Sequence, residues 1–340
     1  MHIEKKGTVV ILATGGTIAG VGDAGKSGGY TPGVMTAAEL VKGIPGLKDI
    51  APVDTIQVCN VNSDDITGEI WLKLCGMINN LAKDENVAGF VVTHGTDTLE
   101  ETAYFLDLTV KTDKPVVLTG SMRPPTALVS DGAQNLFDAV CAAASKETVG
   151  CGVLVAFSGK LYAARDVKKS HTRDLGAINA GEMGAVGRVM RDVGTDVDKK
   201  EKNVFMHRDV KKCHTVDTEF DVSGVEKLPR VNIIYFAVDS DPGLIRRAAE
   251  ISDGLVVAGA GAGEYSLSFK KVIGDVMEEF DIPVVISSRV NDGAISGEYL
   301  LNDNAICAFD LNPQKAAVLL RLALSMTKDV GEIERMFARY

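Results

Sequence analysis

Three short segments place hydroxyl, glycine and carboxylate groups in combinations that suit the hydrolysis of an amide. They read ATGGTIAG at residues 13–20, THGTDT at 93–98 and TGSMRP at 119–124. A threonine hydroxyl becomes a nucleophile once a base removes its proton, and glycine lets backbone amides point at a developing oxyanion. Any one segment taken alone also fits an ordinary turn, so the prediction depends on the three segments lying together.

Each segment follows a short apolar run, at residues 9–12, 90–92 and 116–118. Such runs predict buried strands, and the carboxyl ends of parallel strands meet at one edge of a sheet. We therefore expect the three segments to form a shared site at that edge.

Apolar runs alternate with helical patterns from residue 8 to about residue 155, which predicts βαβ units and a parallel sheet covered by helices on both faces. The predicted helices of this part span 72–81, 99–110 and 133–144, and a further strand spans 153–157. A second series follows, with strands near 231–236, 255–258 and 284–287 and helices near 241–252, 268–280, 313–327 and 332–340. The helix at 313–327 should be capped by Asn312 and opened by Pro313.

The expected fold class is α/β, with a larger N-terminal parallel-sheet α/β domain and a smaller C-terminal α/β domain. The 340 residues exceed what one core usually holds, which favours two domains. Residues 190–229 are charged and weakly patterned, which is typical of a linker region. We place the catalytic domain at 1–206, the linker at 207–229 and the C-terminal domain at 230–340.

Composition argues against several classes of function. The net charge is -10 and no Lys/Arg cluster could follow a phosphate backbone, so nucleic acid is not an expected partner. No apolar stretch reaches membrane-spanning length and the first seven residues lack a secretory signal, so we expect a cytoplasmic protein, or a periplasmic one if a signal peptide was removed. The six cysteines show neither CxxC spacing nor a grouping with the five histidines, so we expect reduced thiols and no metal.

Residues 20–27 (GVGDAGKS) match the phosphate-binding pattern GxxxxGK[ST] letter for letter. That loop must leave a strand directly and open a helix whose amides bind phosphate. Here the predicted strand ends well before residue 20, and the glycine- and proline-rich residues 28–33 do not begin a stable helix. We therefore interpret residues 20–33 as a mobile glycine-rich loop.

Two of the candidate segments also have plain structural interpretations. Asp97 or Thr98 could simply cap the following helix, and His94 is expected to orient its neighbours by hydrogen bonding rather than to act as a base. Residues 165–170 (RDVKKS) are basic, and the local pattern favours a solvated loop over a lysine that reaches into a cleft.

Taken in order, these segments resemble the L-asparaginases, specifically the bacterial type II enzymes, over nearly the whole chain. The resemblance rests on ATGGTIAG, KSGGY at 26–30, VVTHGTDTLEETAYFLDL at 91–108, KPVVLTGSMRP at 114–124, the helix start at 131–136, RDV at 165–167, SSRV at 287–290 and LNPQKA at 311–316. TGGTIAG and HGTDT are the signatures of that family.

The resemblance implies catalytic roles residue by residue. Thr17 corresponds to the nucleophilic threonine, and Tyr30 to the tyrosine of the flexible lid that orders it. Thr96 and Lys169 correspond to the second threonine and the lysine that help to move protons. Asp97 corresponds to the aspartate that grips the α-ammonium group of the substrate.

The resemblance also implies substrate-binding roles. Ser63 would bind the α-carboxylate, and the backbone amides of Gly16 and Thr96 would form the oxyanion hole. Ser121, where the family often has alanine, would contact the side-chain amide. Asp64 stands where the family usually has Gln or Glu, and its carboxylate would attract the α-ammonium group from about one methylene further away.

By resemblance the protein is a homotetramer with its active sites at the interface of an intimate dimer, and it uses no cofactor. Glu298 is the best match for a glutamate that the C-terminal domain lends to the neighbouring subunit. Two positions depart from the pattern. Ala262 replaces an asparagine that many members supply to that neighbour, and the segment around Asp113 lacks the disulfide cysteine of secreted members.

The function implied is hydrolysis of L-asparagine to L-aspartate and ammonia by a threonine nucleophile, with weaker hydrolysis of L-glutamine. A pocket that reads ammonium and carboxylate groups predicts free amino acids rather than peptides as substrates. Because of Asp64 and Ala262, a catalytically impaired sensor that binds asparagine without releasing ammonia is one alternative. A P-loop ATPase that uses residues 20–27 is the other.

Overall fold

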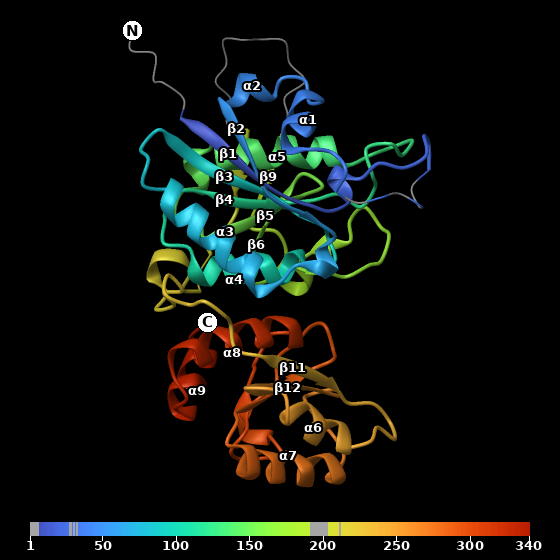
Figure 1. Cartoon of the computed structure of the whole chain (residues 1–340), viewed down its shortest axis with the longest axis vertical. Helices are drawn as coiled ribbons and strands as arrows, with labels where there is room; N and C mark the ends of the chain where they lie inside the picture. Colours follow the sequence, from blue (N-terminus) through green and yellow to red (C-terminus); the bar gives the residue numbers. More distant parts are fainter. Residues whose placement is uncertain (1–6, 27–28, 30, 32, 191–202, 211) are drawn as a thin grey trace. The chain divides into compact units, whose positions relative to one another are not determined.

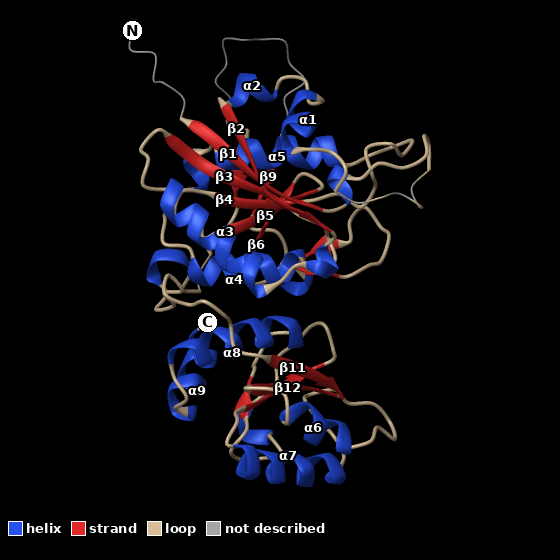
Figure 2. Ribbon diagram, in the orientation of Figure 1, coloured by secondary structure: helices blue, strands red, loops and turns tan. Residues whose placement is uncertain are grey.

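The computed structural model describes residues 7–26, 29, 31, 33–190, 203–210 and 212–340. The chain forms two compact units, Met1–Thr218 and Glu219–Tyr340, each with a sheet of its own (Figures 1 and 2). The division between the units lies inside the segment 207–229 that the sequence analysis assigns to a linker. In the part of the chain described, no helix is long and apolar enough to cross a membrane.

The larger unit is built on an eight-stranded sheet with the order β10-β9-β6-β5-β4-β3-β1-β2. Strands β1 to β5 run parallel, and β6, β9 and β10 extend the sheet through antiparallel pairs. The chain passes from β1 to β2 on one side and then to β3 on the other, so a topological switch point lies between β1 and β3. Open α/β sheets bind ligands at the carboxyl ends of the strands at such a point. The strands are β1 (Thr8–Gly15), β2 (Val53–Val61), β3 (Val87–Thr93), β4 (Val116–Thr119), β5 (Val153–Phe157), β6 (Lys160–Ala163), β9 (Gly187–Val189) and β10 (Val204–Met206), with β7 (Lys168–Lys169) and β8 (Ile178–Asn179) forming a separate pair.

Helices cover both faces of this sheet, as the alternation of strand and helix patterns predicts. Figure 1 shows α3 (Gly68–Leu81) and α4 (Leu99–Thr109) on one face, and α1 (Ala37–Lys42), α2 (Leu47–Ile50) and α5 (Gly132–Ala143) on the other. Ten of the eleven residues of α4 are buried, so this helix is enclosed on almost every side. The core between α5 and the sheet joins apolar side chains of β1, β3, β4 and β5 to those of the helix.

The smaller unit holds a four-stranded parallel sheet of order β11-β12-β13-β14. Figure 1 shows α8 on one face and α6 and α7 on the other, which gives this unit its own core. The strands are β11 (Val231–Tyr235), β12 (Gly254–Gly259), β13 (Val284–Ser288) and β14 (Ile306–Cys307), and the helices are α6 (Gly243–Ala249), α7 (Leu267–Phe280), α8 (Pro313–Met326) and α9 (Val330–Arg339). The two-residue β14 is too short to produce a recognisable pattern and was not predicted.

Several helices begin directly after a capping side chain rather than where their hydrophobic pattern begins. α3 begins four residues before its predicted start because Thr67 accepts a hydrogen bond from a first-turn amide and so caps the helix. α9 likewise begins two residues early, behind Asp329. Asn312 caps α8 and Pro313 opens it, which confirms that prediction.

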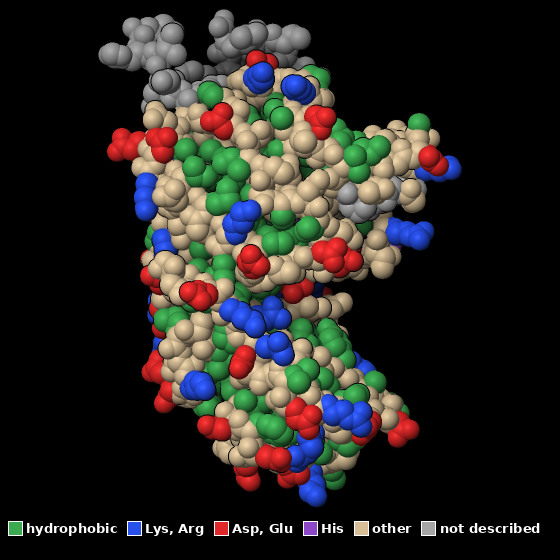
Figure 3. Space-filling view, in the orientation of Figure 1, with side chains coloured by type: hydrophobic (Ala, Val, Ile, Leu, Met, Phe, Trp, Pro, Cys, Tyr) green, Lys and Arg blue, Asp and Glu red, His purple; other side chains and the backbone are tan. Residues whose placement is uncertain are grey.

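The surface carries charges of both signs. On the face drawn in Figure 3, Lys and Arg side chains are interspersed with Asp and Glu side chains.

Gly89 tests the packing of α5 on β3. A Cβ atom at Gly89 would lie 2.2 Å from the carbonyl oxygen of Ala143, at the end of α5. We expect Gly89→Ala to lower the free energy of unfolding by about 1–3 kcal/mol or to prevent folding, because backbone would have to move. Gly76, on the exposed side of α3, meets no other atom within 4 Å, so Gly76→Ala should be neutral or stabilise by about 0.5–1 kcal/mol. Denaturant unfolding compares the variants, and equal stabilities would contradict this packing.

Candidate active site

The close approach of β1 to β3 builds the centre of the site. Gly16 has φ 78°, in the left-handed region that favours glycine, and a Cβ atom on it would lie 2.4 Å from the amide nitrogen of Gly95. Only glycine fits there. Thr17 and Thr96 each follow one of these two glycines, and both side chains are buried. The two predicted segments therefore meet at the switch point, as the sequence analysis expects.

Ser63 joins this centre from the end of β2. It is buried, and the Asp97 amide donates to its hydroxyl at 3.3 Å. The Thr98 hydroxyl donates to the Ser63 carbonyl at 2.6 Å. A Cβ atom on Gly95 would lie 2.8 Å from the Ser63 hydroxyl oxygen, so these residues are in direct contact.

The hydrogen bond between Thr98 and Ser63 bears on the simpler interpretation of this segment. Thr98 does stand at the cap position of α4, but its side chain makes no capping hydrogen bond. Its hydroxyl points to Ser63 instead. The segment therefore does more than begin a helix, because it holds the end of β2 against the end of β3.

Lys169 reaches the same place from β7. Its ammonium group donates to the Thr96 hydroxyl at 2.8 Å and lies 2.5 Å from the Asp97 carboxylate. The lysine side chain is only 16% exposed, so the solvated loop favoured by the local pattern is wrong. The Asp97 side chain, by contrast, is 62% exposed although it pairs with this lysine.

Glu100 holds Lys169 in place. The sequence analysis does not name it as a site residue, because its local sequence is typical of an acidic residue in a first helical turn. It is buried, and its carboxylate accepts a hydrogen bond from the Lys169 backbone amide at 2.6 Å. The two residues lie 69 positions apart, so no local pattern could reveal the contact. Glu100 thereby fixes the short β7 strand against the start of α4.

His94 is a buried, neutral orienting group, as expected. Its Nδ1 lies 2.7 Å from the Gly95 carbonyl, and its Nε2 lies 2.9 Å from the Thr102 hydroxyl, which accepts from the Trp71 indole at 2.8 Å. The indole can only donate and the carbonyl can only accept, so the proton is on Nδ1 and Thr102 donates to Nε2. Burial lowers the pKa of His94 from 6.5 to about 4, although the bond to Gly95 opposes that shift. The chain of bonds orients the peptide that precedes Thr96.

Ser121 lies at the neighbouring strand end, after β4. It is buried, and its hydroxyl donates to the Arg123 carbonyl at 2.8 Å. The Asn135 side chain donates to the Gly120 carbonyl at 2.9 Å and so ties this corner to α5. A Cβ atom on Gly120 would lie 3.3 Å from the Thr96 methyl group, which places the third predicted segment beside the second.

The amides proposed for an oxyanion hole differ in their present partners. The Gly16 amide donates to the Val61 carbonyl at 3.1 Å. The Thr96 amide makes no hydrogen bond within the described ranges. The Thr96 amide is therefore the better placed of the two to donate a hydrogen bond to an oxygen on which negative charge develops.

Of the other predicted site residues, the structure describes Asp64 and Glu298. Asp64 is exposed, one position beyond the buried Ser63. Glu298 is exposed in the smaller unit, and its predicted role in a neighbouring subunit stays a prediction. Tyr30 lies outside the described residues.

The phosphate-loop match is not supported by its surroundings. Lys26 pairs with Asp23 at 2.9 Å and its side chain is 68% exposed. No helix follows within the described residues until α1 begins at Ala37. The two conditions for a phosphate-binding loop are therefore unmet.

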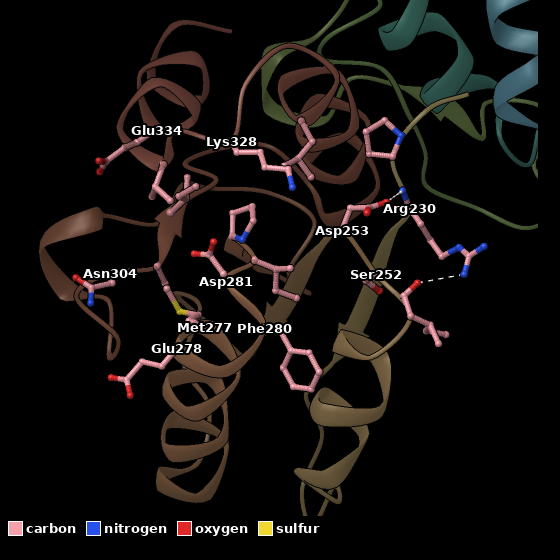
Figure 4. A pocket seen from close by; sticks show the side chains of 18 of the residues that line it. Arg230, Ser252, Asp253, Met277, Glu278, Phe280, Asp281, Asn304, Lys328 and Glu334 are labelled. Carbon is pink, nitrogen blue, oxygen red and sulfur yellow. Dashed lines mark hydrogen bonds between the residues drawn. The ribbon is translucent and has the colours of Figure 1, made fainter. Parts of the chain in front are cut away.

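A hollow of about 1160 Å³ in the smaller unit is a different feature (Figure 4). It lies at the amino ends of the parallel strands and is lined by charged side chains such as Arg230, Asp253 and Lys328. None of the predicted site residues lines it, and ligands of such sheets bind at the carboxyl ends. Among the residues described, no group of three or more His, Cys, Asp or Glu side chains could hold a metal ion.

Comparisons with known proteins agree on the relationships of the chain. The family described as "Asparaginase, N-terminal" matches residues 8–204, and the "Glutaminase/Asparaginase C-terminal domain" matches 230–337. The chain is 41% identical to L-asparaginase 2 of Escherichia coli (strain K12), over 98% of this chain and 93% of that protein. It is 38% identical to the glutaminase-asparaginase of Acinetobacter glutaminasificans, over 98% and 100%. The crystal structure of a probable cytoplasmic L-asparaginase from Campylobacter jejuni has a TM-score of 0.91 and 40% identity, over 98% of this chain and 100% of that one.

The neutral state of His94 predicts a pH dependence of stability. Its pKa is about 4 in the folded protein and 6.5 in an unfolded chain, so the unfolded state binds more protons between these values. The contribution of neutral His94 to the free energy of unfolding is complete above pH 6.5. It is lost as the pH falls towards about 4, by roughly 3 kcal/mol in all. His94→Gln cannot titrate, so the difference in Tm between wild type and variant should narrow from about pH 7 to about pH 4.5. A constant difference over that range would contradict the assignment.

Proposed function

This chain belongs to the asparaginase family of amidohydrolases, and on that premise we propose that it hydrolyses L-asparagine to L-aspartate and ammonia with Thr17 as the nucleophile. The observation that carries the proposal is the contact of the Lys169 ammonium group with both the Thr96 hydroxyl and the Asp97 carboxylate. Thr17 is beside this cluster because Gly16 and Gly95 touch. The tight glycine contact thus brings the proposed nucleophilic hydroxyl, at the end of β1, beside the proposed proton-transfer pair and the carboxylate at the end of β3.

The covalent route suits an amide, which is a poor electrophile, because it divides one large barrier into two smaller ones. The Thr17 oxygen attacks the carboxamide carbon, and the Lys169 ammonium group gives a proton to the departing nitrogen, which leaves as ammonia. The neutral lysine amine regains a proton from the Thr17 hydroxyl through the Thr96 hydroxyl. Water then attacks the acyl-threonine ester and gives up a proton to the same groups. Aspartate departs and the Thr17 hydroxyl is restored.

Charge develops on the carboxamide oxygen in both steps. The Thr96 amide is proposed to donate to it, since this amide has no other partner in the described chain. The Gly16 amide would add a second donor if its 3.1 Å bond to Val61 were exchanged for one to the substrate.

The amino-acid head of the substrate needs a carboxylate site and an ammonium site. Ser63 is proposed to bind the α-carboxylate and Asp97 the α-ammonium group, with the exposed Asp64 adding negative charge nearby. Ser121 would contact the side-chain amide. Glutamine is a weaker substrate in this proposal, because one extra methylene alters transition-state binding by about 1–3 kcal/mol.

A sensor that binds asparagine without hydrolysis remains the second candidate function. Asp64 and Ala262, which differ from the family pattern, are the observations that favour it. They concern substrate binding and the neighbouring subunit, whereas the cluster around Lys169 is complete. We therefore rank catalysis first.

We further propose a homotetramer in which Glu298 completes the site of an adjacent subunit. Exposed apolar side chains at the carboxyl ends of the smaller sheet support an assembly, because they would be covered in it. Tyr235, Val238 and Val290 are 50%, 92% and 51% exposed. We propose a cytoplasmic location, supported by the absence of the disulfide cysteine of secreted members from the segment around Asp113.

Thr17→Val should lower turnover of asparagine by roughly three orders of magnitude or more while leaving the fold intact, because the attacking oxygen is lost. Thr17→Ser, which keeps a hydroxyl, should retain measurable turnover. A coupled ammonia assay with asparagine, glutamine and Mg-ATP measures this. Near-normal rates for Thr17→Val would remove the residue from its role. Asparagine binding by wild type without ammonia release would indicate a sensor, and ATP hydrolysis abolished by Lys26→Ala would indicate an ATPase.

Mixed subunits test the shared site. If Thr17 and Glu298 of different subunits form one site, Thr17→Val and Glu298→Ala chains are each inactive alone, but a mixed dimer contains one intact site. Random mixing by co-expression should then restore about a quarter of wild-type activity. Restoration to no more than the sum of the two separate preparations would show that each site lies within one subunit.

A further inference from the structure

We propose that Thr126 is a positioning residue for the reaction, because its hydrogen bonds fasten residues 22–26 to the loop after β4 that carries Ser121. The inference rests on the proposed function for its effect on catalysis. The fastening itself can be measured without any reaction.

Thr126 holds the segment through both its backbone and its side chain. The Gly25 amide donates to the Thr126 carbonyl at 2.8 Å, and the Gly22 amide donates to the Thr126 hydroxyl at 3.2 Å. Gly25 also pairs with Ala127 in a parallel bridge. Among the residues described, every hydrogen bond that links residues 22–26 to the rest of the larger unit ends on Thr126.

The fastened segment is the continuation of the nucleophile's own turn. Met35 donates to the Ala19 carbonyl at 2.8 Å, and Gly33 donates to the Gly16 carbonyl at 3.1 Å. Val21 and Thr31 then pair in an antiparallel bridge. This stem begins at Gly16 and Ala19, before and after Thr17, so residues 22–26 continue directly from the nucleophile's turn.

Thr126 can serve as a fixed point because its own loop is firmly held. The Asp131 carboxylate accepts the amides of Met122 and Arg123, each at 3.0 Å. The Ser121 hydroxyl donates to Arg123, and the Ala127 amide donates to the Pro124 carbonyl at 3.0 Å. One rigid corner therefore connects the proposed amide-contacting serine to the segment that follows the nucleophile.

The expected effect is on substrate affinity more than on chemistry. Residues 20–26 contain three glycines, which lose much conformational freedom when they are ordered. If the fastening is lost, substrate binding must supply this ordering free energy itself. The chemical groups remain in place, so KM should rise and kcat should change little.

Trypsin provides a direct readout, because Lys26 is the single Lys or Arg between Lys6 and Lys42 and its side chain is 68% exposed. Thr126→Val removes the hydroxyl with little change in size. In this variant the rate of tryptic cleavage after Lys26 should rise about three- to tenfold, the range expected for one lost hydrogen bond. Mass spectrometry of the digested full chain measures this rate. KM for asparagine should rise by a similar factor, with kcat within about twofold.

Two control variants isolate the hydroxyl. Thr126→Ser keeps it and should behave as wild type in cleavage and KM. Thr112→Val removes another threonine hydroxyl that accepts a backbone amide, that of Lys114 at 3.1 Å, and should leave both readouts unchanged. Equal impairment of Thr126→Ser and Thr126→Val would overturn the role of the hydroxyl.

The outcomes separate this inference from the proposed function. Ammonia release by wild type, with no change in cleavage or KM for Thr126→Val, would overturn the inference alone. No ammonia release by wild type would overturn the proposed function, and with it the catalytic part of the inference. Faster cleavage in Thr126→Val would still support the fastening in that case.

Discussion

The contact between Gly16 and Gly95 is the constraint on which the site depends. No side chain fits between these two residues, so the ends of β1 and β3 come closer than strands bearing side chains could. The same closeness lets Ser63 rest against Gly95 from the end of β2. Three strand ends therefore converge on one point, and the residues that follow the two glycines are the proposed nucleophile and the proposed proton-transfer threonine. A methyl group at either glycine would push these hydroxyls apart.

The largely buried side chain of Lys169 requires negative charge and hydrogen-bond acceptors around its ammonium group. A largely buried ammonium group is costly unless it is paired and hydrogen-bonded. Asp97 pairs with the Lys169 ammonium group, the Thr96 hydroxyl accepts a hydrogen bond from it, and the Glu100 carboxylate accepts one from the Lys169 backbone amide. Glu100 lies in the first turn of α4 and Asp97 lies two residues before the helix, where the helix dipole also favours negative charge. Charge balance and geometry are thus supplied by one short stretch of chain.

Local patterns identified the ends of β1, β3 and β4, the parallel sheet and most helices, because each of these depends on residues near one another in the sequence. They failed for Lys169, which looked like part of a solvated loop. Its partners lie 69 to 73 positions away, and contacts at that separation leave no periodic signal. Only the resemblance to a family pointed to this lysine, and no signal pointed to Glu100 or Thr126 as site residues. Tyr30 and Glu298 depend on that resemblance alone.

The burial of α4 has a mechanical consequence for the molecule. A helix enclosed along nearly its whole length cannot shift without disturbing both the sheet and its neighbouring helix. The side of the candidate site that α4 forms is therefore rigid. Residues 22–26, by contrast, are mostly exposed, and every hydrogen bond that joins them to the rest of the larger unit within the described chain ends on Thr126, so this segment is the more compliant one. When a molecule binds, the charged groups near the start of α4 would therefore stay in place, and the segment that follows the nucleophile's turn would move to fit it.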